Sequence, residues 1–203
     1  MAKRPLENVP EIAVASADDL RIWLAAEHAH STGVWVVTKK KTASTGYVPL
    51  GDIVDTCLCF GWVDSLPRAK DELRTMLYIS PRKPGSNWSR INKDKVARLV
   101  EAGLMHPAGA AVVERSKADG SWTALDDVEN LVIPPDLQTA FDAQPGSEEN
   151  WQAFPRSVKR GALEILLKAR RTATRKAKID TIVSDSAANQ RPFQWKGPGK
   201  TSG

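Results

Sequence analysis

The change from helical to strand periodicity at Gly61 constrains the fold of this chain more than any other feature. Before it, the stretch PLGDIVDTCLCFG repeats apolar residues at three- and four-residue steps, which predicts a buried helix that begins at Pro49. After it, WVDSLPR and LRTMLYIS alternate with a period of two around a charged tip, which predicts a hairpin with an irregularity at Pro67. A helix over about residues 17–29 and a strand in VWVVTKK complete a small α+β unit.

Strand signals almost vanish beyond Pro84, where the sequence predicts a series of helices broken by glycine and proline. The predicted fold class is therefore α+β, with an N-terminal helix and a small antiparallel sheet followed by an all-helical C-terminal region. The expected organisation has five parts: a flexible N-terminus (1–15), an α+β domain (16–84), linking helices (85–133), a C-terminal helical domain (134–190) and a disordered tail (191–203).

The composition indicates a folded protein that needs no metal or disulfide, because 41% of its 203 residues are hydrophobic. Cys57 and Cys59 are expected to be buried free thiols, since a helix would turn their side chains apart. The spacing of His28, His30 and His106 does not suit a metal site, and neither a metal nor a cofactor is predicted. We expect a cytoplasmic protein, because no secretory signal and no apolar stretch of membrane-spanning length is visible.

The first candidate functional site is one face of the hairpin's first strand. Side chains alternate with a period of two in a regular strand, so the residues expected to share this face are Trp62, Asp64, Leu66 and Arg68. Two interpretations of Asp64 stay open. Its carboxylate could have a raised pKa beside a tryptophan and act as a base, or it could pair across the hairpin with Lys70 or Arg74.

The second candidate is the basic turn YISPRKPGSNWSRINKDK, residues 78–95. The side chains that could bind a ligand here are Arg82, Lys83, Trp88 and Asn92. The cations could hold a phosphate or carboxylate, and the indole could stack on a ring. In the structural alternative, Ser86 or Asn87 caps the next helix, and Trp88 fills the junction between the α+β and helical parts.

Positive charge is concentrated in the C-terminal part of the chain. The net charge is +5, but residues 156–180 alone carry nine basic and two acidic residues. The cations expected on this surface are Lys159, Arg160, Lys168, Arg170, Arg171, Arg175 and Lys176. Such a surface could bind nucleic acid by counterion release or attract an anionic membrane, and a solvated helix face also explains it.

No catalytic motif accompanies these candidates. The sequence contains neither G-x-S-x-G nor H-E-x-x-H, and no Rossmann glycine fingerprint follows a predicted strand. We therefore predict no catalytic residue.

Several stretches, in order along the chain, resemble one family. CFGWVDS, PRKPGSNWSRIN, AGLMHPAG, KADGSW, IPPDLQTAF and FPRSVKRGALEILLKARRTATRKAKI are together similar to the YdeI/OmpD-associated family, also called bacteriocin-protection proteins, over about residues 20–191. The resemblance implies a bacterial protein that protects against bacteriocins or antimicrobial peptides. It also implies an association with an outer-membrane porin and an N-terminal domain of the YjbR/CyaY-like α+β kind.

The sequence therefore favours a cytoplasmic, non-enzymatic protein of this family, which contributes to stress or bacteriocin tolerance by binding an unidentified protein or small anionic ligand. Two alternatives stay open. One is a nucleic-acid-binding module that uses the basic C-terminal helix pair. The other is a small anionic-ligand receptor or enzyme with a pocket near Asp64 and Trp88.

Overall fold

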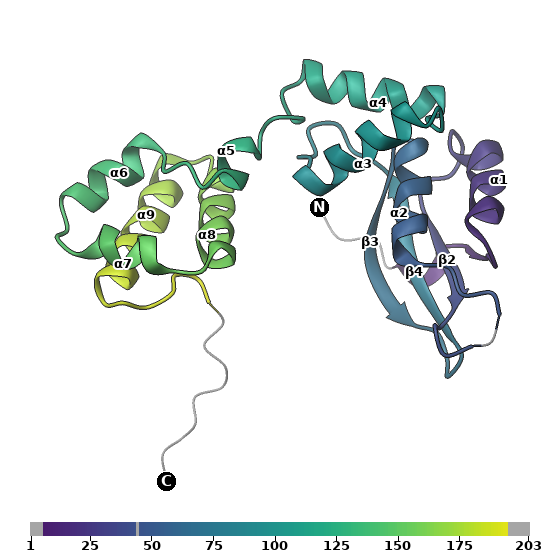
Figure 1. Cartoon of the computed structure of the whole chain (residues 1–203), viewed down its shortest axis with the longest axis horizontal. Coiled ribbons are helices and arrows are strands. Elements are labelled where there is room, and N and C mark those ends of the chain that lie inside the picture. The colour runs from purple at the N-terminus through teal and green to yellow at the C-terminus, as the bar shows by residue number, and fades with distance from the viewer. Residues whose placement is uncertain (1–5, 44, 195–203) are drawn as a thin grey trace, which may run out of the picture. The chain divides into compact units, whose positions relative to one another are not determined.

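The chain divides into two compact units, Met1–Ala124 and Leu125–Gly203 (Figure 1). The computed structural model describes residues 6–43 and 45–194. Unit 1 combines a sheet with helices, and unit 2 is helical in its described part. The predicted α+β class with an all-helical C-terminal region is therefore confirmed.

Unit 1 consists of a four-stranded sheet and four α-helices in its described residues. Its elements are the 3₁₀ helix η1 (Leu6–Asn8), the strands β1 (Glu11–Ala13), β2 (Val34–Lys39), β3 (Trp62–Ala69) and β4 (Arg74–Pro81), and the helices α1 (Ala17–Glu27), α2 (Leu50–Cys59), α3 (Arg90–Glu101) and α4 (Pro107–Ala118).

The sheet is mixed rather than antiparallel. Its strand order is β1-β2-β4-β3, and β1 pairs parallel with β2 while the other pairs are antiparallel. The parallel strand comes from the segment expected to be a flexible N-terminus, residues 1–15, of which residues 1–5 lie outside the described part. A strand of three residues is too short for an alternating pattern to reveal it, so pairing with β2 defines it.

The helices of unit 1 cover one face of the sheet. Leu20 and Leu24 of α1 pack in the same core as Val34 and Val36 of β2. Ser16 begins α1 with a capping box, in which its side chain accepts from the amide of Asp19. On the opposite face, Trp35 is buried and its indole N–H donates to the carbonyl of Leu6, 3.1 Å away.

The stretch CFGWVDS forms a corner between α2 and β3, against which α4 packs closely. Gly61 has a positive φ of 72°, and a Cβ there would lie 2.5 Å from Val112 of α4. At Gly109, a Cβ would lie 2.1 Å from the backbone oxygen of Cys59. The predicted helix end at Gly61 is confirmed, and Cys57 and Cys59 are buried free thiols, as expected.

Unit 2 packs its helices around a second hydrophobic core. Its elements are α5 (Asp126–Glu129), α6 (Pro135–Asp142), α7 (Ser147–Ala153), α8 (Arg156–Lys168) and α9 (Thr172–Ala187). The fully buried side chains at its centre include Leu137, Trp151, Leu166 and Ile182. None of the helices in the described residues combines the length and the apolar character needed to cross a bilayer.

The segment 85–133, expected as a set of linking helices, is shared between the units. Val96 and Leu99 of α3 and Val113 of α4 belong to the core of unit 1, whereas Leu125 and Val128 belong to that of unit 2. The boundary between the units lies between residues 124 and 125, because each helix belongs to the unit in whose core its apolar residues are buried.

The tail expected over residues 191–203 begins with ordered contacts. Pro192 is buried, and Phe193 packs against the core of unit 2, with the ammonium of Lys178 5.0 Å from its ring centroid. Residues 195–203, the rest of the predicted tail, lie outside the described residues.

Candidate functional site

A β-bulge splits the residues that the sequence places on one face of β3. Asp64 is opposite Ile79, but Leu66 is opposite Tyr78, so Ser65 is an extra residue in the ladder. Trp62 and Asp64 therefore face one side of the sheet, while Leu66 and Arg68 face the other. The irregularity was predicted at Pro67, two residues further along. The sequence reveals that Pro67 has no N–H to donate. It does not reveal the position of the bulge, because that depends on how β3 pairs with β4.

Arg68 and Asp64 have different surroundings from those expected. The guanidinium of Arg68 lies 4.9 Å from the ring of Trp35, on the face opposite the helices. Lys70 pairs with Glu11 at 2.5 Å, and Arg74 pairs with its neighbour in the turn, Asp71. The predicted pairing of Asp64 with Lys70 or Arg74 is wrong, because Lys70 binds Glu11 of β1 and Arg74 binds Asp71 of the hairpin turn.

Arg82 and Trp88 form a buried stack in the loop between β4 and α3. The guanidinium carbon of Arg82 lies 3.8 Å from the centroid of the Trp88 ring, and Trp88 has no exposed surface. Arg82 also donates to the backbone oxygens of Ser86 and Asn87, which closes the loop around its own side chain. The stack therefore holds the loop in place from its buried side. Trp88 is part of the core of unit 1, so its role is structural.

Burial affects the charge of this stack. Desolvation lowers the pKa of Arg82 to about 10, which still leaves the side chain charged at neutral pH. Arg82 Nε and the indole nitrogen of Trp88 are buried donors without an acceptor among the described residues. The stacking and the two backbone carbonyls thus support a cation that is only partly satisfied by hydrogen bonds.

The remaining predicted ligand-binding residues differ in burial and position. Trp62 is buried in the helix-side core, and Lys83 is exposed in the loop. Asn92 lies in the first turn of α3, where its amide donates to the hydroxyl of Ser89, so Ser89 caps the helix rather than Ser86 or Asn87. Trp88 contacts a further indole, that of Trp122, with ring centroids 5.0 Å apart.

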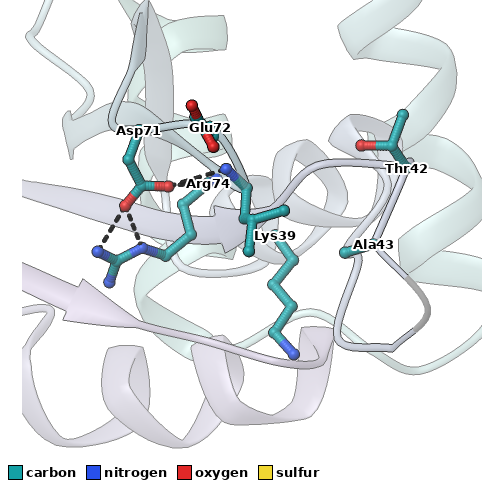
Figure 2. Close-up of a pocket in the computed structure, with 7 residues that line it drawn as sticks. Lys39, Thr42, Ala43, Asp71, Glu72 and Arg74 are labelled. Atoms are coloured by element: carbon teal, nitrogen blue, oxygen red, sulfur yellow. Dashed lines mark hydrogen bonds and ion pairs between the residues drawn. The ribbon is translucent and has the colours of Figure 1, made fainter.

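A separate open hollow of about 800 Å³ lies where the hairpin tip meets the loop after β2 (Figure 2). Its lining residues are Lys39, Thr42, Ala43, Asp71, Glu72, Leu73 and Arg74. Asp71 is occupied by Arg74, and its pKa is held below the ordinary value mainly by that hydrogen bond. In Figure 2, the ammonium of Lys39 and the carboxylate of Glu72 point away from each other. The hollow therefore offers dispersed charges rather than a convergent binding site.

Most of the predicted basic surface is neutralised within unit 2. Arg160 binds Glu129 and Glu164, each at 2.9 Å, and Lys168 also binds Glu164, at 2.6 Å. The hydrogen bond from Lys168 is the largest cause that lowers the pKa of Glu164. This cluster of charges stabilises α8 along its own exposed side.

The second helix of the predicted basic surface is neutralised in the same way. Arg175 pairs with Asp136 at 2.5 Å, and Lys176 pairs with Asp180 at 2.8 Å. Lys159 donates to the carbonyl of Gln152. Arg170 and Arg171, in the turn between α8 and α9, are exposed and form no ion pair with the described residues. A phosphate could therefore contact Arg170 and Arg171, and also Lys159, whose hydrogen bond to a carbonyl leaves its charge without an ion pair among the described residues.

An aromatic and cationic cluster at the end of α2 was not predicted. The rings of His28 and His106 have centroids 4.8 Å apart, and His106 stacks on Phe60 at 4.7 Å. His106 is the N-cap of α4, because its Nδ1 accepts from the amide of Ala108. Burial, His28 and Arg21 together lower the pKa of His106. Sequence spacing could not reveal this pair, since only folding brings residues 28 and 106 together.

The thiols of the corner stretch have the properties of core residues. Burial raises the pKa of both Cys57 and Cys59, so the thiolate is disfavoured at neutral pH. No group of three or more histidine, cysteine or acidic side chains suited to a metal occurs among residues 6–43 and 45–194.

Two family models match separate parts of the chain. Residues 130–189 match the family described as "Bacteriocin-protection, YdeI or OmpD-Associated", and residues 12–112 match a domain of unknown function, DUF8412. Each match lies within one structural unit. The resemblance seen in the sequence extended over about residues 20–191. Its N-terminal part lies in the region that matches DUF8412 rather than the bacteriocin-protection family. No curated protein and no solved structure shows significant similarity to the chain.

Proposed function

Residues 130–189 belong to the bacteriocin-protection, YdeI or OmpD-associated family, and from this membership we propose that the protein raises bacterial tolerance to bacteriocins or other antimicrobial peptides through binding. The family match is the observation that carries the proposal. The cytoplasmic location expected from the sequence is part of the proposal, and cell fractionation with an antibody to the protein tests it.

The chemistry of the described side chains supports binding rather than catalysis. A cysteine nucleophile needs an accessible thiolate, whereas Cys57 and Cys59 are buried with raised pKa values. Trp62 and Trp88, the aromatic residues predicted to line a reactive pocket, have 1% and 0% of their surface exposed. A substrate could therefore reach neither indole without a rearrangement of the core.

The proposal is tested by deleting the gene and measuring survival against a panel of bacteriocins and cationic antimicrobial peptides. We expect the deletion to lower the inhibitory concentration of at least one of these agents, and a plasmid copy of the full chain to restore it. Unchanged survival across the panel would overturn the proposal. Growth in the absence of any agent is the control for a general defect.

Nucleic-acid binding is a second candidate, favoured by the adjacent exposed arginines Arg170 and Arg171, which form no ion pair with the described side chains. Two phosphate contacts correspond to a slope of only about −1.8 in a plot of log affinity against log salt. We therefore expect weak binding that is lost in the double variant with Arg170→Ala and Arg171→Ala. A steeper slope would show that further cations, such as Lys159 or the paired cations of α8 and α9, also contact phosphates.

A further inference from the structure

The outer edge of β1 pairs with no other strand in the part of the chain that the structure describes. The amide of Trp35 donates to the carbonyl of Pro10, and the amide of Val14 donates to the carbonyl of Val37. Because bonding residues alternate along a parallel strand, Pro10, Ile12 and Val14 bond to β2, and the backbone groups of Glu11 and Ala13 point away from it. Both of these residues are exposed. The strand therefore presents backbone donors and acceptors to solvent.

A groove of about 550 Å³ lies along this edge, on the side of the sheet that α1 covers. The residues that line it are Ile12, Ala13, Val14, Asp19, Ile22, Trp23, Ala26 and Glu27. Its most exposed apolar side chain is Ile22, which keeps 71% of its surface accessible. The groove thus offers apolar contact surface directly beside unpaired backbone groups.

The charge of this groove has one sign. Among residues 6–43 and 45–194, Asp19 and Glu27 line it and no lysine or arginine does. The hydrogen bond from the amide of Ala15, which precedes α1, is the main cause that holds the pKa of Asp19 below its ordinary value, so its carboxylate stays ionised at neutral pH. Glu27 is exposed at the last turn of α1, where a negative charge is unfavourable to the helix dipole. A partner with positive charges would complement both carboxylates.

The other edge of the sheet lacks these properties. β3 carries the bulge at Ser65 and a proline, Pro67, which has no N–H to donate, and Arg68 is exposed beside them. A bulge, a proline and a positive charge are the features by which sheet edges avoid pairing with another strand. β1 contains neither a bulge nor a proline, and Lys70, which pairs with Glu11, binds its side chain rather than its backbone, so β1 is the edge at which an added strand fits.

We propose that the edge of β1 and its groove bind a basic, partly apolar peptide segment in an extended conformation, which adds to the sheet beside β1. The peptide backbone would bond to Glu11 and Ala13. Side chains on one side of the peptide would contact Ile22 and Trp23, and its lysines or arginines would approach Asp19 and Glu27. A second copy of the chain is the poorer occupant, because its own edge brings the same negative charges.

The identification of such a segment with an antimicrobial peptide rests on the proposed function. The chemistry of the groove does not depend on it. Cationic, partly apolar peptides are nevertheless the class of molecule against which the proposed function acts, so the two proposals name compatible partners.

The binding test uses the full chain and a fluorescein-labelled peptide of eight alternating lysine and valine residues, followed by anisotropy at low salt. We expect saturable binding that weakens as salt is added. Two control peptides separate the contributions: one with glutamate in place of lysine, and one with N-methyl groups on alternate amides, which cannot pair along that edge. Both controls should bind at least about tenfold more weakly, given the net value of charge-assisted and backbone hydrogen bonds.

Two variants locate the site. Ala13→Pro removes a backbone donor that points away from β2, and proline is tolerated at such an edge position, so we expect about a tenfold loss of affinity with a retained fold. Glu27→Lys reverses a groove charge at the end of α1 and should weaken binding about threefold or more. The matched control is Glu101→Lys, the same change at the exposed last residue of α3, and it should change affinity less than about twofold.

The proposal would be overturned if Ala13→Pro and Glu27→Lys bound the peptide as tightly as the control Glu101→Lys. It would also be overturned if the N-methylated and unmodified peptides bound with equal affinity. Dimerisation of the full chain that Ala13→Pro abolishes would instead identify a second copy as the occupant and would also overturn it. The deletion strain separates the two proposals. If the Ala13→Pro and Glu27→Lys chains lose peptide binding yet restore peptide tolerance fully, the identification of the bound segment with an antimicrobial peptide fails while the proposed function stands. If peptide binding follows the predicted pattern without a survival phenotype, the proposed function fails alone.

Discussion

At the scale of single residues, a glycine sets how closely α4 approaches the end of α2. A Cβ at Gly109 would lie 2.1 Å from the backbone oxygen of Cys59, which cannot move aside as a flexible side chain could. We expect Gly109→Ala to lower the free energy of unfolding by about 1–3 kcal/mol through overpacking. Urea unfolding followed by circular dichroism measures the change.

The matched control is the same substitution at Gly161, in the interior of α8. A Cβ there meets no atom within 4 Å, so Gly161→Ala should raise the free energy of unfolding by about 0.5–1 kcal/mol through helix propensity alone. If both variants were stabilised, the close approach of α4 to α2 would be contradicted.

His106 links stability to pH. Its Nδ1 accepts from the amide of Ala108, and burial, together with the nearby His28 and Arg21, opposes its protonation. The folded pKa is therefore below the unfolded value of about 6.5, so the unfolded chain binds the proton more readily. Stability from this group is complete above about pH 6.5 and is lost as the pH falls from there through the folded pKa.

We expect His106→Asn to flatten the pH dependence of stability between about pH 7.5 and 5.5. Asparagine still offers an oxygen to the amide of Ala108 but does not titrate. The measurement is the urea midpoint of both proteins across this range. An unchanged slope in the variant would assign the pH dependence to other groups.

At the scale of elements, ion pairs join the helices of unit 2. Arg175 of α9 holds Asp136 of α6 through two nitrogens, at 2.5 and 2.9 Å, and also donates to the carbonyl of Leu166. We expect Arg175→Ala to lower the free energy of unfolding by about 0.5–1 kcal/mol, as for a partly exposed bidentate pair. Arg171→Ala, which removes no such pair, should change it by less than about 0.5 kcal/mol.

Thermal unfolding of the two arginine variants at low and high salt provides the comparison. Salt screens the pair of Arg175 with Asp136, so the difference between the variants should shrink as salt is added. A larger effect of Arg171→Ala than of Arg175→Ala would contradict the assignment of these charges.

At the scale of the whole molecule, the two units have separate cores. Unit 1 buries residues such as Leu20, Val36 and Trp88, whereas unit 2 buries Leu137 and Trp151. We expect the fragments 1–124 and 125–203 to fold independently, because each carries its own hydrophobic core and the boundary crosses neither. Cooperative thermal unfolding of each purified fragment by circular dichroism is the measurement, and a fragment without a transition would contradict it.

The sequence by itself determined the class and order of most elements. The period change at Gly61, the capping pattern at Ser16 and the apolar alternation of β4 are local signals, and the helices, the hairpin and the buried cysteines follow from them. The ordered similarity of several stretches to one family was also present in the sequence, and it is confirmed for residues 130–189.

Only the tertiary structure decided which side chains meet. The bulge at Ser65, which sends Asp64 and Arg68 to opposite faces, depends on how β3 pairs with β4. The partners of the C-terminal cations, and the short strand β1 with its open edge, likewise depend on residues distant in sequence. Periodicity indicates which face of a helix or strand is buried. It does not indicate which other helix or strand covers that face, because this depends on the packing of many elements at once. For that reason the sequence could not show that residues of β1 and α1 together line a groove.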